Sequence, residues 1–482
     1  MSAVVTSRFE TVHSFRDPAG VVVQHQGQIF RFLTRDGYRI LESFLATVTA
    51  GEYLRSGHLA STKMLSPDQV RELLQDPALR GIAEQNETTA ICEHQRIWFP
   101  SFPHEWPAEM LHAAADLTLS LAGQCFADGF GIKDATPSNI LFNGPTPVFV
   151  DLLSFEKRNP NDPIWLAQAQ FQRMFLLPLA ANRHLRLDPS ELLLSRRDGI
   201  EPEEFYQWLG PLKRLNPSLM PIVTLPVWFR SKESGELYQQ QSVDPERAQF
   251  ILRMLLYRLR SQCRGLAPAR NHPSRWSAYM SAGASYSPEQ LAEKQSFVER
   301  ALGEHRPQGL LDLGCNTGHY SFLAARQGAR VVAVDSDPAV VGEVWRQAKR
   351  DGLNVLPLVV DLGRPTPALG WRNQECPSFL ERAQGKFDFV LMLAFIHHLL
   401  ITERVPLDEV LSLVAQITSN LALIEFVDPE DPMFRRLVRG RDSLYQHLTH
   451  ELFEQRSACR FRILKRHPIS GSHRWLYLLE KK

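Results

Sequence analysis

A glycine-rich segment at residues 311–318 (LDLGCNTG) has the composition of a ligand-binding turn. It follows an apolar run and precedes a helical pattern, where the first turn of a nucleotide-binding sheet belongs. Gly314 and Gly318 let the backbone turn sharply and approach a ligand closely. A dinucleotide site requires G-x-G-x-x-G, whose second glycine makes room for a pyrophosphate. Asn316 stands at that position, and the pattern D-x-G-x-x-x-G that begins at Asp312 suits the amino-acid end of S-adenosylmethionine, which has no pyrophosphate.

Two further carboxylates end the next two predicted strands. Asp335 follows the apolar run 331–334 and lies 21 residues beyond Gly314, close to the offset of about 20 residues expected for a ribose-binding acid. Its carboxylate could accept hydrogen bonds from both ribose hydroxyls. Asp361 ends the run 358–360, where it could meet the adenine amino group. Each residue could be an ordinary helix cap when taken alone, but their order and spacing together predict a cofactor site.

Two histidines follow the fourth predicted strand, residues 387–393. His397 and His398 would lie beside the reactive sulfonium, where an imidazole could remove the proton of a hydroxyl or ammonium acceptor. His397 is the first candidate for this base and His398 the second, although either could instead cap the following helix. Adjacent histidines lack the spacing of a helical zinc pair, and no other His/Cys/Asp group has metal-ligand spacing, so we predict no metal site.

An arginine cluster follows the fifth predicted strand, with guanidinium groups at Arg435, Arg436, Arg439 and Arg441. A guanidinium can hold a phosphate or carboxylate through two parallel hydrogen bonds. The cluster could therefore bind an anionic group on the acceptor. A solvated helix face is the alternative interpretation of such a run.

Strands and helices alternate from residue 287 to residue 480, which predicts a parallel sheet with helices on both faces. The carboxyl ends of such strands gather at one edge, where ligands bind. The Gly-, Pro-, Arg- and Asn-rich stretch 261–275 is the predicted linker between a domain at 1–265 and a domain at 275–482. The strands expected in the second domain are 310–313, 330–334, 356–360, 387–393, 421–426, 460–466 and 474–480, and the helices are 287–305, 319–327, 340–351, 407–418 and 442–455.

Segment 311–400 resembles class I S-adenosylmethionine-dependent methyltransferases, with LDLGCNTG as the first motif, Asp335 as the ribose acid and FDFVLMLAFIHHL as the fourth strand. The segments KDATPSNILFNGPTPVFVDLLSFE, IEFVDPEDPMFRRL and SHRWLYLLEKK extend the resemblance to a bacterial family of nodulation-protein-related methyltransferases. It implies a Rossmann-like, doubly wound, seven-stranded α/β sheet at the C-terminus. It also implies methyl transfer from S-adenosylmethionine to O or N of a small-molecule or glycan-related acceptor. The acceptor itself does not follow, because fold and cofactor do not fix it.

Residues 132–151 (IKDATPSNILFNGPTPVFVD) resemble the catalytic and metal-binding loops of protein-kinase-like enzymes. The resemblance implies an α+β N-terminal domain in which Asp134 takes the acceptor proton, and Asn139 and Asp151 hold magnesium. The sequence departs from that pattern. Ile-Lys-Asp replaces His-Arg-Asp, and Asp-Leu-Leu replaces Asp-Phe-Gly. No glycine-rich loop or strand lysine is evident. Residues 20–34 predict a hairpin with its turn at Gln26 and Gly27, and Arg31 is the nearest charged residue on that hairpin.

Three interpretations of the N-terminal half therefore stay open. It could bind ATP and magnesium and make the chain a bifunctional kinase-methyltransferase. It could be a pseudokinase-like module that shapes the acceptor site, its loop Asp and Asn being ordinary turn residues. A non-enzymatic scaffold is the third class, which the intact motif of the C-terminal half disfavours.

Composition limits the partners of the chain. Its 54 Lys and Arg nearly cancel its 53 Asp and Glu across 482 residues, so the whole chain has no field that would demand nucleic acid or anionic lipid. Six scattered cysteines without a C-x-x-C pair suggest reduced thiols and a cytoplasmic protein. We expect no signal peptide and no membrane span, and the sequence does not determine the oligomeric state.

Overall fold

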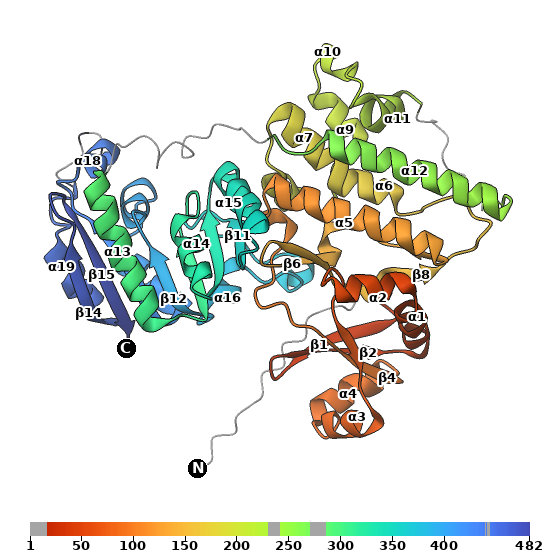
Figure 1. Ribbon diagram of the computed structural model, residues 1–482, viewed down its shortest axis with the longest axis horizontal. Coiled ribbons are helices and arrows are strands. Elements are labelled where there is room, and N and C mark those ends of the chain that lie inside the picture. Colours follow the sequence, from red (N-terminus) through yellow and green to blue (C-terminus); the bar gives the residue numbers. More distant parts are fainter. Residues whose placement is uncertain (1–16, 230–241, 270–285, 439, 441–443) are drawn as a thin grey trace.

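The computed structural model describes residues 17–229, 242–269, 286–438, 440 and 444–482. Figure 1 shows a C-terminal half built on one sheet with flanking helices, and an N-terminal half that combines a small sheet with many helices. No helix within these described ranges is long and apolar enough to cross a membrane.

The C-terminal half contains one seven-stranded sheet in the order β11-β10-β9-β12-β13-β15-β14. The first five strands in this order are parallel, and β15 runs antiparallel to both β13 and β14. This arrangement confirms the predicted Rossmann-like, doubly wound sheet. The strands are β9 Gly309–Leu313, β10 Arg330–Asp335, β11 Val355–Val359, β12 Phe387–Met392, β13 Thr418–Val427, β14 Phe461–Pro468 and β15 Arg474–Lys481.

Successive residues of the central strand β9 pack on opposite faces of the sheet, as strand geometry requires. Leu310 joins Phe322 of α14 in one core cluster. Leu311 joins Phe379 of α16 and Val410 of α17 in a second, larger cluster. Both faces are therefore covered. The helices of this half are α13 Pro288–His305, α14 His319–Arg326, α15 Pro338–Asp351, α16 Phe379–Ala383, α17 Leu407–Ile417, α18 Pro432–Val438 and α19 His450–Ser457.

Helix starts in this half follow their capping residues. The hydroxyl of Ser287 accepts the backbone N–H of Gln290 in a capping box, so α13 begins where the sequence predicts. The helix predicted for 442–455 is wrong in its bounds, because Thr449 caps α19 by accepting the backbone N–H of Leu452. Residues 445–447 before it form a turn, 448 and 449 are irregular, and 441–443 lie outside the described residues.

The N-terminal half begins with a four-stranded antiparallel sheet in the order β1-β2-β4-β3. The predicted hairpin turn at Gln26 and Gly27 is confirmed, and both residues have positive φ. The strands are β1 Gly20–His25, β2 Gln28–Leu33, β3 Thr62–Met64, β4 Ala90–His94, β5 Phe130–Ile132, β6 Ile140–Asn143, β7 Thr146–Phe149 and β8 Phe155–Lys157. The helices are α1 Arg35–Leu45, α2 Val48–Arg55, α3 Pro67–Leu73, α4 Pro77–Gln85, α5 Ala108–Ala127, α6 Gln168–Phe171, α7 Leu177–Leu185, α8 Pro189–Ser195, α9 Pro202–Trp208, α10 Pro211–Arg214, α11 Leu225–Trp228 and α12 Pro245–Gly265.

The two halves meet where α15 approaches α5 and the β6–β7 turn (Figure 1). Trp345 of α15 donates its indole N–H to the carbonyl of Pro145 at 3.1 Å. The next residue, Arg346, forms an ion pair with Glu109 of α5. These contacts join the methyltransferase-like sheet to the segment that contains the predicted kinase-like loop.

Candidate active site

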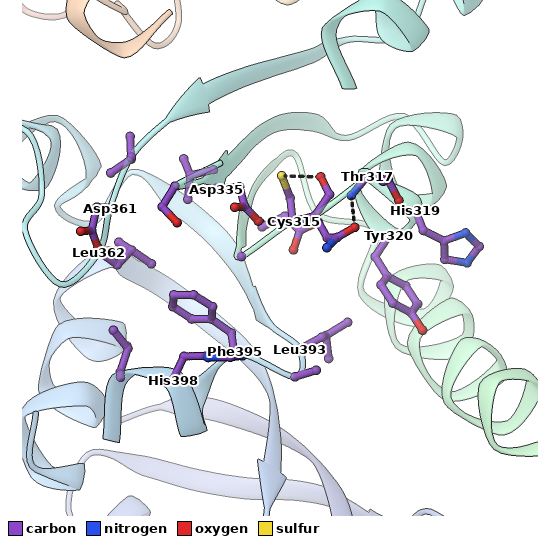
Figure 2. Close-up of a pocket in the computed structure, with 18 of the residues that line it drawn as sticks. Cys315, Thr317, His319, Tyr320, Asp335, Asp361, Leu362, Leu393, Phe395 and His398 are labelled. Atoms are coloured by element: carbon purple, nitrogen blue, oxygen red, sulfur yellow. Dashed lines mark hydrogen bonds between the residues drawn. The ribbon is translucent and has the colours of Figure 1, made fainter. Parts of the chain in front are cut away.

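A cavity of about 240 Å³ opens at the carboxyl ends of β9, β10, β11 and β12 (Figure 2). This is the edge of an open α/β sheet at which ligands bind. Of the six predicted cofactor residues, Gly318 is not on the cavity wall. The other five line the cavity: Asp312, Gly314, Asn316, Asp335 and Asp361. The fold therefore brings together side chains that are up to 49 residues apart in the chain, from 312 to 361.

The glycine loop depends on two residues with left-handed backbone. Gly314 has φ +73° and Gly318 has φ +80°. A Cβ atom on Gly314 would lie 2.4 Å from the ring of Phe395, which forms part of the cavity wall. A Cβ atom on Gly318 would lie 2.9 Å from Val344 of α15. Gly314 thus shapes the ligand-binding surface, whereas Gly318 fixes the start of α14 and its packing on α15.

Two backbone N–H groups hold the carboxylate of Asp335. Its Oδ2 accepts from Asn316 and its Oδ1 accepts from Asp337, each at 3.0 Å. Burial raises the pKa of Asp335, although these backbone hydrogen bonds lower it. Each oxygen keeps a second lone pair, so the carboxylate can still accept from two ribose hydroxyls. Asp361 is exposed at the cavity mouth, and its Oδ1 accepts from the backbone N–H of Gly363 at 2.9 Å.

The cavity carries more negative than positive side chains. Asp312 is buried on its wall, where Oδ2 accepts from the hydroxyl of Ser321 at 2.6 Å. Burial raises the pKa of Asp312 to about 6, against the effect of that hydrogen bond. Within the described part of the chain, Lys294 is the one Lys or Arg on the wall, and Glu425 pairs with it at 2.6 Å. Such a cavity suits a ligand with cationic groups, and S-adenosylmethionine has a sulfonium and an ammonium.

The structure separates the two candidate histidines. His398 begins the short helical turn η7 (His398–Thr402) and lines the cavity. His397 is completely buried, is absent from the cavity wall, and has no hydrogen-bond partner for either ring nitrogen among the described residues. Burial lowers the pKa of His397 well below its usual value, so its imidazole is neutral. The geometry therefore favours His398 for contact with an acceptor, whereas sequence reasoning preferred His397.

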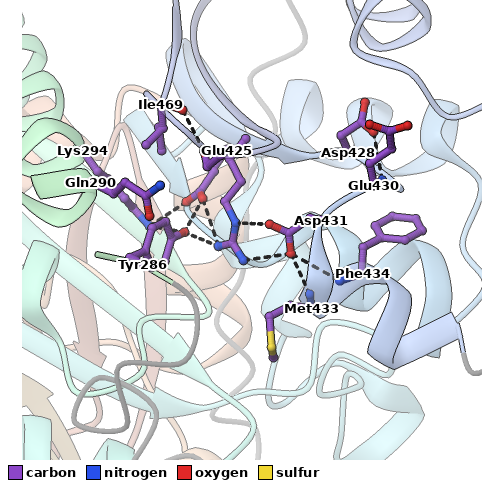
Figure 3. Close-up of polar contacts among 12 residues, drawn as sticks. Tyr286, Gln290, Lys294, Glu425, Asp428, Glu430, Asp431, Met433, Phe434 and Ile469 are labelled. Carbon is purple, nitrogen blue, oxygen red and sulfur yellow. Dashed lines mark hydrogen bonds and ion pairs between the residues drawn. The ribbon is translucent and has the colours of Figure 1, made fainter. Parts of the chain in front are cut away.

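A buried ionic network adjoins the cavity beside α13 (Figure 3). Lys294 lies 2.6 Å from Glu425, and Arg474 of β15 lies 3.4 Å from the other oxygen of Glu425. Arg474 also pairs with Asp431 at 2.8 Å. Tyr286, on the cavity wall, donates to Glu425 and accepts from Arg474. Each buried charge therefore has an opposite partner, and the network fixes this wall of the cavity.

Sequence reasoning missed this network, because its members are distant in the chain. Lys294 and Arg474 are 180 residues apart. A charged residue inside the apolar strand LALIEFV was the one available signal, since Glu425 there requires a buried partner.

The predicted arginine cluster does not reach the cofactor cavity in the part that the structure describes. Arg435 and Arg436 lie on α18, and neither lines the cavity. Arg439 and Arg441 lie outside the described residues. An acceptor role for the cluster stays a prediction without structural support.

An acidic and histidine cluster lies beyond the end of β13, and none of its residues lines the cofactor cavity. Asp428, Glu430 and His473 bring potential ligand atoms within 4.8 Å of one another. Glu430 and His473 are exposed and form an ion pair with each other at 3.4 Å. Sequence spacing did not suggest this cluster, because His473 comes from the turn before β15.

Comparisons with known proteins agree with this geometry. A family model described as "Methyltransferase domain" matches residues 285–463. The chain is 30% identical to the nodulation protein NoeA of Rhizobium meliloti (strain 1021) over 473 residues. This alignment covers 97% of this chain and 95% of NoeA. The chain belongs to the NoeA family. It is an S-adenosylmethionine-dependent methyltransferase of class I, as the sequence resemblance implies.

One further curated protein and one solved structure are similar to part of this NoeA-family chain. The O-antigen chain terminator bifunctional methyltransferase/kinase WbdD of Escherichia coli is 28% identical over 149 residues, which is 30% of this chain and 18% of WbdD. The crystal structure of the N-methyltransferase NodS from Bradyrhizobium japonicum WM9 aligns with a TM-score of 0.30 at 14% identity, covering 40% of this chain and 98% of NodS. The match to WbdD spans a small part of that protein, so it gives no evidence about a second activity of this chain.

The predicted kinase-like loop of this NoeA-family chain is a closed hydrogen-bonded group. Asn139 donates to the backbone carbonyl of Asp134 at 2.9 Å and to the hydroxyl of Ser154 at 3.1 Å. Ser154 in turn donates to Asp151 at 2.6 Å. Arg31 of β2 donates to the other oxygen of Asp151 at 3.0 Å. The structure thus brings the three predicted loop residues together, with Arg31 as a partner in place of a strand lysine.

The ion pair with Arg31 sets the charge of Asp151. Burial alone would raise the pKa of this carboxyl, but Arg31 and the Ser154 hydroxyl outweigh burial and hold the pKa below its usual value. Burial raises the pKa of Asp134, with a smaller effect from Asp151. Asp151 is therefore ionised, and the guanidinium of Arg31 is its positively charged partner.

Proposed function

We propose that this methyltransferase transfers a methyl group to an oxygen or nitrogen of a small-molecule or glycan-related acceptor. The single observation that carries the proposal is the cavity in which Asp312, Asp335 and Asp361 converge at the carboxyl edge of the sheet. WbdD is by its name an O-antigen chain terminator, which supports a glycan-related acceptor. The chain has a net charge of +1, which gives no general attraction for a nucleic-acid acceptor.

Different residues on the cavity wall would bind different parts of S-adenosylmethionine. Asp335 would accept from the ribose, Asp361 would meet the adenine amino group, and Gly314 with Asn316 would allow close approach of the backbone. Asp312 would face the ammonium at the amino-acid end. The bound cofactor supplies an electrophilic methyl group on sulfur, so the protein needs to align an acceptor and exclude water.

We propose His398 as the base that takes the acceptor proton, in place of our first candidate, His397. His398 reaches the cavity, whereas the imidazole of His397 is buried and has its ring centroid 4.3 Å from that of His398. A base must lie within hydrogen-bond reach of the proton that it removes. His397 would then hold the position of His398 through packing.

We further propose that the chain consists of a kinase-like α+β domain at 1–265 and a methyltransferase domain at 275–482. The favoured role of the first domain is a pseudokinase-like module that shapes the acceptor site, in a cytoplasmic enzyme. The ion pair of Arg31 with Asp151 supports this role, because it occupies the carboxylate that magnesium would need. A bifunctional kinase-methyltransferase is the second candidate, and the side-by-side Asp134, Asn139 and Asp151 favour it.

Calorimetric titration of the full-length protein would test these proposals. We expect S-adenosylmethionine and S-adenosylhomocysteine to bind competitively at one site, and ATP with magnesium not to bind. Binding of ATP with magnesium that Asp151→Ala abolishes would establish the bifunctional alternative. Absence of S-adenosylmethionine binding would contradict the cofactor site. Methyl transfer from labelled S-adenosylmethionine to oligosaccharides, small alcohols and amines, with transfer RNA as a comparison, would identify the acceptor class.

A further inference from the structure

Helix α12 (Pro245–Gly265) is already partnered on one face. Its buried side chains recur every three or four residues, as expected for a helix face that packs on a core. None of them is more than 6% exposed: Ala248, Leu252, Leu256, Leu259 and Cys263. Arg260 donates to the backbone carbonyl of Leu119 in α5 at 3.2 Å, which anchors this face to the N-terminal half.

The opposite face of α12 also carries large apolar side chains, which is unusual for a surface helix. Phe250 is 63% exposed, Met254 is 50% exposed and Tyr257 is 65% exposed. At about 100° per residue these three side chains lie within about 60° of one another around the helix axis. We call them the α12 stripe. Figure 1 shows α12 running along the outside of the N-terminal half.

Arginines flank the α12 stripe on both sides. The helical period places Arg253 and Arg264 on one side of it and Arg247 and Arg258 on the other. All four side chains are exposed, and none has an ion-pair partner among the residues that the structure describes. From Arg247 to the end of the helix the sequence contains no Asp or Glu. The chain as a whole is nearly neutral, so this concentration of positive charge is local.

The combination of an apolar stripe with flanking arginines favours some binding partners for this face of α12 over others. A second copy of the chain that paired stripe against stripe would bring arginines against arginines, which like-charge repulsion opposes. An anionic bilayer accepts apolar side chains between its headgroups and offers phosphates to the guanidinium groups. The helix is about 30 Å long, enough to lie along such a surface, and it is not apolar enough to cross it.

We propose that the α12 stripe and its flanking arginines dock the protein on an anionic membrane surface. The helix lies in the plane of the headgroups, with Phe250, Met254 and Tyr257 inserted and the arginines on lipid phosphates. This interaction is independent of the methyltransferase site, because α12 contributes no residue to the cofactor cavity.

Vesicle sedimentation of the full-length protein tests the proposal. We expect co-sedimentation with vesicles that contain phosphatidylglycerol and phosphatidylcholine, weak binding to vesicles of phosphatidylcholine alone, and loss of binding at high salt. Free inorganic phosphate at the same phosphate concentration should not compete, since the apolar stripe contributes nothing to its binding.

Two paired variants assign the binding to this face. F250S/Y257S removes apolar area, and R253E/R258E reverses the flanking charge; each should raise the lipid concentration for half-maximal binding by about tenfold or more. The matched controls are W371S, an exposed aromatic of the other half, and K63E/R71E, which makes the same change in net charge. Unchanged circular dichroism and S-adenosylmethionine affinity would show that the α12 variants fold.

Several outcomes would overturn the proposal. The first is that the wild-type protein does not bind anionic vesicles. The second is that both α12 variants bind these vesicles as tightly as the wild-type protein. The third is that the control variants lose as much vesicle affinity as the α12 variants. A dimer in light scattering that F250S/Y257S converts to a monomer would show that a second copy covers the face. Binding to an acidic protein surface in place of vesicles would equally exclude the bilayer.

Discussion

Arg382 of α16 forms an ion pair with Glu105, and both side chains are almost completely buried although they come from opposite halves of the chain. The hydroxyl of Thr366 also donates to Glu105 at 2.6 Å, and Arg382 donates to the backbone carbonyl of Pro100 at 2.6 Å. Burial would raise the pKa of Glu105, but Arg382, His104 and the Thr366 hydroxyl together lower it below its usual value and keep the carboxylate ionised. The segment before α5 is thus fastened to the methyltransferase half by charged groups removed from water.

Arg382→Met should destabilise the full chain by about 3–5 kcal/mol, because it leaves the charge of Glu105 buried without a partner. Urea unfolding followed by fluorescence measures the change. Arg462→Met is the matched control, since it breaks an exposed ion pair with Glu480 and should cost less than about 1 kcal/mol. Equal effects of the two variants would show that the buried pair does not join the halves.

Asp335→Ala should weaken S-adenosylmethionine binding by roughly 10- to 100-fold, because the carboxylate no longer accepts hydrogen bonds from the two ribose hydroxyls. Calorimetric titration measures the affinity. Asp388→Ala is the control, because Asp388 also accepts two backbone N–H groups but lies at the opposite, amino end of β12. An unchanged affinity in Asp335→Ala would remove Asp335 from the site.

Cofactor affinity should fall as the pH drops through about 6, the pKa to which burial raises Asp312. Above that pH the carboxylate is charged and attracts the ammonium of the ligand; below it the group is neutral. Asp312→Asn retains an acceptor for Ser321 and should show the low affinity at every pH. Titrations between pH 5 and pH 8 would check this, and a parallel pH dependence in both proteins would assign the effect to another group.

Gly314→Ala should lower both stability and cofactor affinity, because the new Cβ atom meets the ring of Phe395. We expect a clash cost of about 1–3 kcal/mol and at least a tenfold weaker affinity. Gly328→Ala separates the clash from backbone strain, since Gly328 also has positive φ but nothing lies within 4 Å of its Cβ position. Similar losses in the two variants would mean that strain alone is responsible.

His398→Gln should slow methyl transfer by about 100-fold or more while cofactor affinity stays close to the wild-type value. His397→Gln should lower stability first, because it replaces a buried ring. The measurements are the rate of transfer to the acceptor found by screening and the unfolding midpoint. A larger rate effect at His397 with unchanged stability would return the catalytic role to that residue.

Contiguous motifs made the cofactor side of the cavity predictable. The order of Asp312, Gly314 and Asp335 along the chain reflects the βαβ connection directly, since these residues lie at or next to the carboxyl ends of β9 and β10. The doubly wound sheet follows for the same reason. Sequence spacing did not distinguish His397 from His398, because both follow the same strand directly. Adjacent side chains at a helix start point about 100° apart, so the fold decides which imidazole faces the cavity.

Long-range electrostatic pairing was not predictable from local patterns. The partners of Glu425 and Glu105 are set by tertiary contact. The apolar strand around Glu425 indicates that a buried partner is needed but not which residue it is, and the loop around Glu105 gives no sign of Arg382. In the N-terminal half, α3 and α4 lie between β3 and β4 and were also missed. Their short polar sequences start at Ser66 and Asp76, each an N-cap followed by proline.

Adjacent residues of α15 link the glycine loop to the N-terminal half. Val344 packs under Gly318, and Trp345 donates to the carbonyl of Pro145 in the β6–β7 turn. A ligand that immobilises the loop therefore also restrains the helix that holds this turn. Deuterium uptake at the β6–β7 turn should slow when a ligand fills the cavity. Amide exchange in one half of the chain would therefore report ligand occupancy in the other half.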